Sequence, residues 1–118
     1  MATCCGRKCL ERAVDYLMAN LTQPISLADL ARVSKVSGPT LIRAFRERYR
    51  TTPIAFLRAR RLDAVHRTLL TADPEEGLVT NTALRYGFAH LGRFAENYFN
   101  AFGEKPSDTM RANTGIGI

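Results

Sequence analysis

Residues 26–53 read SLADLARVSKVSGPTLIRAFRERYRTTP and contain two helical patterns separated by a short turn. Apolar side chains recur every three to four residues on both sides of the turn, which is the spacing of amphipathic helices. Ser26 and Ser37 stand directly before the two patterns, where a hydroxyl group can cap the free N–H groups of a helix. The stretch predicts a short helix over 27–34, a turn, and a longer helix that opens with Gly38 and Pro39.

The same pattern recurs in residues 83–108, which read ALRYGFAHLGRFAENYFNAFGEKPSD. Each copy predicts a short helix, a tight turn, a longer helix and then a proline, which is the pattern of a helix-turn-helix. The second copy has one extra residue in its turn. Four positions match at an offset of 53 residues: Leu41 with Phe94, Phe45 with Tyr98, Tyr49 with Phe102, and Pro53 with Pro106.

Helical patterns also surround the two copies. They predict a first helix over about 8–20, a helix from Pro53 to about Thr71, short helices near 80–86 and from Pro106, and a helix near 90–101 that Gly103 ends. The predicted fold is all-α, with about seven helices in two helix-turn-helix subdomains, residues 8–52 and 78–112, which a long linker helix over 53–72 joins.

The net charge of +6 is concentrated in one segment. Residues 43–61 contain seven arginines and one acidic residue, Glu47, whereas the rest of the chain is balanced. On the helix that opens at Gly38, Pro39, Arg43, Arg46 and Arg50 lie within about 60° of one another, opposite an apolar face. A localised cluster of arginines is what contacts with phosphate groups require. The alternative is a charged face that only meets solvent.

The sequence does not indicate an enzyme. It has two histidines, His66 and His90, and no nucleophile, acid pair or glycine-rich phosphate loop at the spacing of a known motif. Cys4, Cys5 and Cys9 are odd in number and lack a second half-site for zinc, so we expect reduced thiols and no metal or cofactor.

No stretch approaches the roughly 18–20 apolar residues of a membrane span. The N-terminus lacks the apolar segment of a secretory signal. We therefore expect no contact with a membrane and a location in the cytoplasm.

The chain resembles the AraC/XylS family of bacterial transcription regulators over about residues 8–112. Residues 26–53 are similar to the first helix-turn-helix of that family, residues 58–70 to its linker helix and residues 83–108 to its signature stretch. The most specific residues are Gly87-Phe88, His90-Leu91-Gly92-Arg93-Phe94, Phe102-Gly103 and Pro106. The resemblance implies sequence-specific binding of double-stranded DNA and transcription regulation.

In this family two recognition helices read the DNA. Two helices held about one DNA turn apart, roughly 34 Å, can enter successive major grooves, and one chain with two different readers recognises an asymmetric site. The resemblance also implies RNA polymerase as a partner. Family members often carry an additional N-terminal effector-binding or dimerisation domain, so we expect this chain alone to be a monomer and to oligomerise only through such a domain.

The resemblance places five residues of the first reader at the DNA. Arg43 is the candidate for a base contact, because arginine can pair bidentately with guanine; its alternative is an ion pair with Glu47. Arg46 is expected at a phosphate, and Ile42 either meets a thymine methyl group or is simply exposed. The full set is Pro39, Thr40, Ile42, Arg43 and Arg46, and the further expected phosphate contacts are Lys35, Ser37, Arg50, Arg58 and Arg61.

The second reader is expected to present His90, Gly92, Arg93, Glu96 and Asn97 to DNA. Arg93 is the candidate base reader, and Gly92 would let the backbone come close. His90 either caps its helix or reaches a phosphate, and we expect the cap. The opposite stripe is expected to be core: Leu91, Phe94, Tyr98 and Phe102.

Two positions depart from the family pattern. Lys35 and Arg50 stand where the family commonly has a glycine or another small residue, so the two turns beside the first reader differ from the usual ones. A competing interpretation remains a basic helical module that binds acidic protein partners without reading DNA sequence. Selectivity among DNA sequences at fixed salt separates the two, because charge attraction alone is blind to sequence.

Overall fold

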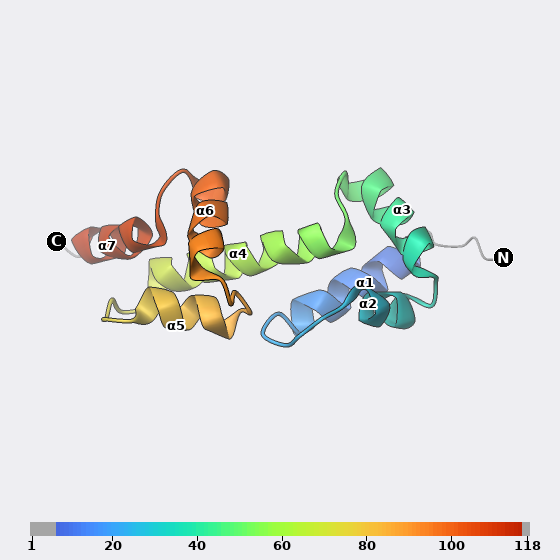
Figure 1. Ribbon diagram of the computed structural model, residues 1–118, viewed down its shortest axis with the longest axis horizontal. Helices are drawn as coiled ribbons and strands as arrows, with labels where there is room; N and C mark the ends of the chain where they lie inside the picture. Colours follow the sequence, from blue (N-terminus) through green and yellow to red (C-terminus); the bar gives the residue numbers. More distant parts are fainter. Residues whose placement is uncertain (1–6, 117–118) are drawn as a thin grey trace. The chain divides into compact units, whose positions relative to one another are not determined.

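A computed structural model describes residues 7–116 of the chain (Figure 1). Within these residues it contains seven helices and no strand, which confirms the all-α prediction. None of the helices described is both long enough and apolar enough to cross a membrane. The helices are α1 (Arg7–Ala19), α2 (Leu27–Ser34), α3 (Gly38–Tyr49), α4 (Pro53–Thr71), α5 (Leu78–Arg85), α6 (Leu91–Phe102) and α7 (Pro106–Ile116).

The chain divides into two compact units, residues 1–60 and 61–118, and the division falls inside α4. Leu57 of α4 belongs to the core of the first unit, whereas Leu62, Val65 and Leu69 belong to the core of the second. The predicted linker helix therefore supplies side chains to both hydrophobic cores.

The first unit buries apolar side chains from α1, α2 and α3 around Phe45, which is fully buried. Phe56 packs edge-on against Phe45 with ring centroids 5.4 Å apart, and Tyr49 lies 4.8 Å from Phe56. The remaining buried members of this core are Leu10, Ala13, Leu17, Leu30, Leu41, Ala44 and Leu57.

Both predicted serine caps are present. The Ser26 hydroxyl accepts a hydrogen bond from the Asp29 N–H at 3.1 Å, and the Asp29 carboxylate accepts one from the Ser26 N–H at 3.0 Å. Ser37 accepts from the Thr40 N–H at 3.3 Å. These bonds satisfy N–H groups that the first turn of each helix leaves without a partner, and so they fix where α2 and α3 begin.

The second unit packs α4, α5 and α6 around Tyr98 and contains a chain of hydrogen bonds. The Tyr98 hydroxyl donates to Thr109 at 2.7 Å, and Thr109 donates to the Glu104 carboxylate. The Tyr98 oxygen is 2.9 Å from Nδ1 of His66. Because the hydroxyl hydrogens of Tyr98 and Thr109 are already engaged, the His66 Nδ1–H is the donor to Tyr98. This chain ties α7 to α6 and α4.

The repeat extends upstream of both turns. At an offset of 52 residues, buried residues of α1 match buried residues of α4: Leu10 with Leu62, Ala13 with Val65, and Leu17 with Leu69. The later part of α4 therefore contributes to the core of the second unit in the same way as α1 contributes to the core of the first. Helix α4 is both the linker helix and the first helix of the second repeat.

Four expectations need correction. Leu91 is 39% exposed, so it is not core, because it stands at the first position of α6. His90 occupies the predicted N-cap position, but its side chain makes no capping hydrogen bond. Cys9 is buried and disulfide-bonded rather than a reduced thiol. The same expectation for Cys4 and Cys5 lies outside the described residues. The last helix is longer than predicted, since α7 continues to Ile116.

Candidate nucleic-acid interface

The exposed side of α3 carries the cluster of arginines. Pro39, Arg43, Arg46 and Arg50 are all exposed, and we call them the arginine face. Leu41, Ala44 and Phe45 on the other side of the helix are buried in the core. Packing of that apolar side fixes the rotation of α3, so the arginine face is directed away from the core of the first unit.

Arg43 at the middle of this face is exposed, and no ion pair within the described residues joins it to Glu47. Its guanidinium group therefore keeps all its donors for a ligand, which a bidentate contact with guanine needs. Ile42 and Thr40 beside it are half-buried, and the Thr40 hydroxyl accepts a hydrogen bond from Ser37 at 2.9 Å.

A hollow of about 450 Å³ lies at the turn between α2 and α3. It brings together three predicted residues, Lys35, Ser37 and Thr40, and adds Arg32, which the sequence analysis did not select. Arg32 pairs with Asp29 at 3.1 Å, and its side chain stays 67% exposed. The sequence signal for Arg32 is its position in the last helical turn of α2, directly before the loop that leads to the recognition helix.

A second hollow, of about 420 Å³, lies where Arg46 and Arg50 meet the start of α4. It is lined by Arg46, Arg50, Thr51, Thr52 and Ala55. Thr52 caps α4, since its hydroxyl accepts from the Ala55 N–H at 3.2 Å. A helix N-terminus carries partial positive charge, and its combination with two arginines is chemically suited to a phosphate group. Thr51 and Thr52 were missed, although two threonines before a proline predict a capped helix start.

The second reader, α6, presents its predicted residues around a wider hollow of about 690 Å³. His90, Gly92, Arg93 and Glu96 line this hollow together with Ala89 and Leu91. Asn97 is half-buried and does not line it. The structure thus brings four of the five predicted residues of this reader to one surface.

Gly92 stands in open space. A Cβ atom placed on Gly92 would meet no atom within 4 Å, and its backbone is not in a left-handed conformation. Glycine weakens a helix relative to alanine, and no packing inside the protein requires it here. The backbone of α6 at Gly92 is therefore open to close approach from outside the protein.

The arginines at the start of the linker helix have different surroundings. Arg58 is exposed, whereas the Arg60 guanidinium lies over the Phe56 ring at 5.2 Å. Arg61 is half-buried beside Gly87, and burial lowers the pKa of its guanidinium group. Of the two predicted phosphate contacts on this helix, Arg58 is the one directed into solvent.

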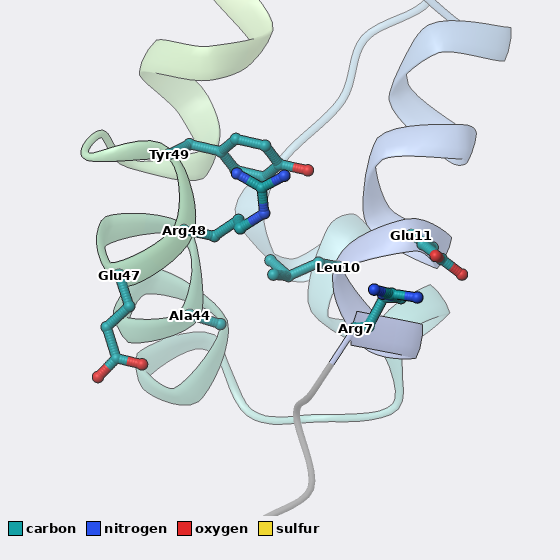
Figure 2. A pocket seen from close by; sticks show the side chains of 7 residues that line it. All are labelled: Arg7, Leu10, Glu11, Ala44, Glu47, Arg48 and Tyr49. Atoms are coloured by element: carbon teal, nitrogen blue, oxygen red, sulfur yellow. The ribbon is translucent and has the colours of Figure 1, made fainter.

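Another pocket, of about 480 Å³, lies between α1 and α3 on the side of α3 that faces α1 (Figure 2). Figure 2 shows Leu10 pointing from α1 toward α3, with the Arg48 guanidinium beside the Tyr49 ring at 5.1 Å. Arg7 and Arg48 are balanced by Glu11 and Glu47 around it. This mixed charge distinguishes the pocket from the arginine face and does not suit a polyanion.

Comparisons with known proteins agree with the helix-turn-helix architecture. Residues 30–112 match the model of a family described as a helix-turn-helix domain. The XylDLEGF operon transcriptional activator of Pseudomonas putida is 42% identical over 106 residues, which are 90% of this chain and 33% of that protein. The XylDLEGF operon transcriptional activator 2 of the same organism is 41% identical over 105 residues, 89% of this chain and 67% of that protein.

A solved structure gives the same result. The crystal structure of a probable AraC family transcriptional regulator from Rhodopseudomonas palustris CGA009 superposes with a TM-score of 0.81 at 34% identity, covering 89% of this chain and 96% of that one. The chain spans about a third of the length of the first activator named above. From its repeat, its seven helices and these relatives, the chain belongs to the AraC/XylS family of transcription regulators and corresponds to the double helix-turn-helix DNA-binding domain of that family.

Proposed function

We propose that this chain binds double-stranded DNA sequence-specifically and regulates transcription, with α3 and α6 as recognition helices in successive major grooves. The observation that carries the proposal is the arginine face of α3, which follows a tight turn and lies opposite the buried side of the helix. An exposed recognition helix after such a turn is what a major groove admits.

The first reader combines base contact with phosphate contact. Arg43 near the middle of the exposed side can donate to guanine O6 and N7. Arg46 and Arg50 lie beside the capped start of α4 and are suited to a backbone phosphate. Lys35 and Ser37, at the turn between α2 and α3, provide a second phosphate-binding position. Phosphate contacts fix the register of the helix, so that the base contact meets a defined position.

The second reader uses fewer charges. Arg93 is its exposed cation, and Gly92 beside it leaves the backbone open to close approach. Glu96 can accept a hydrogen bond from cytosine N4. His90 makes no capping bond, so its imidazole is available for a phosphate. Because the two readers differ in side chains, we expect an asymmetric site of two blocks about ten base pairs apart.

Selection of bound duplexes from a random pool at about 150 mM salt tests this proposal. We expect an enriched asymmetric motif whose two blocks lie about one DNA turn apart. The Arg48→Ala variant should select the same motif as the wild-type chain, because Arg48 lies over the Tyr49 ring at the pocket between α1 and α3 and not on the arginine face. Absence of enrichment, with binding that disappears as salt rises, would mean only an electrostatic patch and would favour the protein-interaction module.

Three further parts of the proposal concern partners and place. We propose that a single copy binds the site, since one chain carries both readers, and that further association depends on segments outside this domain. RNA polymerase is the proposed protein partner, which fits relatives named as operon transcriptional activators. The cytoplasm is the proposed location, because the relatives are bacterial and a bacterial DNA-binding protein acts where the chromosome lies.

A further inference from the structure

We infer that Arg61 is a positioning residue for the second reader: its guanidinium group holds the turn between α5 and α6, and it does not contact phosphate. The inference rests on the proposed function for its consequence in DNA recognition. Its first part, that Arg61 stabilises the turn, concerns the free protein alone.

The geometry of the turn carries the argument. Gly87 has φ +87°, and a Cβ atom placed on it would lie 3.5 Å from Nη1 and 3.6 Å from Cζ of Arg61. The guanidinium group therefore lies at van der Waals distance from that Cβ position, on the side of the turn where any other residue would carry its side chain. Two backbone hydrogen bonds close the turn there, from Gly87 N–H to Leu84 at 3.0 Å and from Phe88 N–H to Ala83 at 2.9 Å.

The repeat gives an independent reason why Arg61 is directed inward. At the offset of 52 residues that aligns α1 with α4, Arg61 corresponds to Cys9, which is 2% exposed. The next residue in each helix, Leu10 and Leu62, is buried in its own core. The position is therefore inward-facing in both halves, and Arg61 extends from it to the turn rather than to solvent.

The surroundings of Arg61 agree with this placement. The side chain is half-buried, and desolvation lowers the pKa of its guanidinium group. A phosphate-binding arginine gains from an exposed guanidinium, as Arg58 one turn earlier has. In the first half the matching turn residue is Lys35, whose own side chain occupies that side of the turn. The second half replaces this side chain by a glycine and the end of an arginine from another helix.

The choice of substitution separates positioning from phosphate contact. Arg61→Lys keeps the positive charge but loses the planar group that lies against Gly87. A phosphate contact would largely survive this change, whereas the support of the turn would not. Arg58→Met, on the exposed side of the same helix, is the matched control for a phosphate contact.

Amide hydrogen exchange on the free protein tests the first part. For Arg61→Lys we expect faster exchange at Gly87 and Phe88, by about tenfold, and unchanged exchange at Lys35 and Val36 of the first turn. Unchanged exchange at Gly87 and Phe88 overturns the inference, whatever the protein does with DNA. The test does not use DNA, so it is independent of the proposed function.

Binding to the duplex that the wild-type chain selects tests the second part. For Arg61→Lys we expect discrimination in the second block to fall about fivefold or more, the first block to be unaffected, and the salt dependence to be unchanged. For Arg58→Met we expect the negative slope of log affinity against log salt to become shallower by about 0.9, with both blocks still recognised. If Arg61→Lys retains discrimination in both blocks, Arg61 does not position the reader. If the wild-type chain selects no duplex, the proposed function fails, while the exchange result still decides the role of Arg61 in the turn.

Discussion

The two helix-turn-helix halves share a backbone pattern but differ in the side chains that face outward. At the offset of 53 residues, Glu96 of α6 stands in the place of Arg43, Phe99 in the place of Arg46, and Gly103 in the place of Arg50. Phe99 is 52% exposed. The buried positions keep their apolar character through the repeat, whereas none of these three outward positions in the second half carries a positive charge. The repeat thus preserves a fold, while each half can carry a different kind of contact.

This difference assigns the halves unequal roles in the proposed function. We propose that the arginines and helix starts of the first half hold phosphates, so that this half supplies most of the electrostatic attraction. Helix α6 of the second half has a single arginine, Arg93, beside the open Gly92, and we propose that it depends more on close fit.

The largest expected effect on stability is in the core of the second half. We predict that Thr109→Val lowers the free energy of unfolding by about 1–3 kcal/mol, because it leaves the Tyr98 hydroxyl and the Glu104 carboxylate without their shared partner. Thermal or urea unfolding measures the change. The matched control is Thr71→Val, whose exposed hydroxyl only bonds the Arg67 carbonyl, and it should have little effect. Equal losses in the two variants would contradict the importance of the chain.

The core of the first half should respond to loss of a hydroxyl in the opposite direction. Ser34 is 1% exposed, and its hydroxyl has no hydrogen-bond partner among the described residues. Ser34→Ala is therefore expected to stabilise the protein, because it removes a buried polar group that gains nothing. A loss of stability in the same unfolding experiment would show that this hydroxyl is satisfied in solution.

The turn residues provide the next comparison. The first half ends α2 and α3 with Lys35 at φ 62° and Arg50 at φ 61°, whereas the second half ends α6 with Gly103 at φ 76°. A left-handed backbone costs a non-glycine residue about 1–2 kcal/mol. We predict that Gly103→Ala destabilises the protein by about 1 kcal/mol and that Lys35→Gly stabilises it by up to about 1 kcal/mol, less the entropy that glycine adds to the unfolded chain.

Unfolding of the two variants measures both changes. A Cβ on Gly103 meets no atom within 4 Å, so a steric clash does not confuse the result. If Lys35→Gly destabilises the protein, then the Lys35 side chain makes a contribution that exceeds the strain of its backbone.

Gly92 tests whether the open backbone of α6 serves a ligand. We predict that Gly92→Ala raises the stability of the free protein by a few tenths to about 1 kcal/mol, because alanine favours helix and the site is empty. The same substitution should weaken binding to the selected duplex. Gly38→Ala is the control within the first half, since its Cβ would lie 3.3 Å from Leu27 Cδ2 and should not stabilise. A stable Gly92→Ala variant with unchanged DNA affinity would remove Gly92 from the interface.

The smallest expected effects are on the pH dependence of stability. Asp29 of the first half should shape the acid side of the curve of stability against pH, and Tyr98 of the second half should shape its alkaline side. The capping bonds from Ser26 and the Arg32 guanidinium hold the pKa of Asp29 below its ordinary value of 3.8. Its stabilising contribution is present above that value and is lost as pH falls through it toward the lower folded pKa. Burial raises the pKa of Tyr98 above its ordinary value of 10.0, so its contribution is present below pH 10.0 and is lost as pH rises beyond it.

Unfolding measured across pH checks both signs. Asp29→Asn should flatten the acid limb, and Tyr98→Phe should flatten the alkaline limb. An acid limb that is the same in Asp29→Asn and in the wild-type chain would mean that Asp29 is not shifted in solution.

The fold could be predicted from the sequence to the extent that local patterns determine it. Ser26, Ser37 and Gly103 identify helix ends because each acts on the backbone of its own turn. The repeat then arranges these helices into two halves. The hydrogen-bonded chain of His66, Tyr98, Thr109 and Glu104 does not follow from the sequence pattern, because it joins residues up to 32 positions apart through hydrogen bonds that no periodicity encodes.

The candidate site was predictable where side-chain direction follows from helix angle. The exposure of Arg43 and Arg46 follows from the burial of Phe45 on the same helix. Arg61 could not be placed in this way, because a long side chain at a half-buried position can turn to solvent or to a neighbouring turn. Leu91 was assigned to the core because its spacing fits, but the first residue of a helix can lie beyond the edge of the core it faces.

In the proposed function, the two halves of the chain read two separate blocks of one DNA site. Binding of Arg43→Ala and Arg93→Ala to single-base variants of the selected duplex tests it directly. We predict that each substitution relaxes discrimination within one block by about 1–3 kcal/mol and leaves the other block unchanged. The block that Arg43→Ala affects should be the one that Arg93→Ala leaves unchanged, and the reverse. If both substitutions weaken binding to every variant equally, with no block that either one affects selectively, the chain does not have two readers.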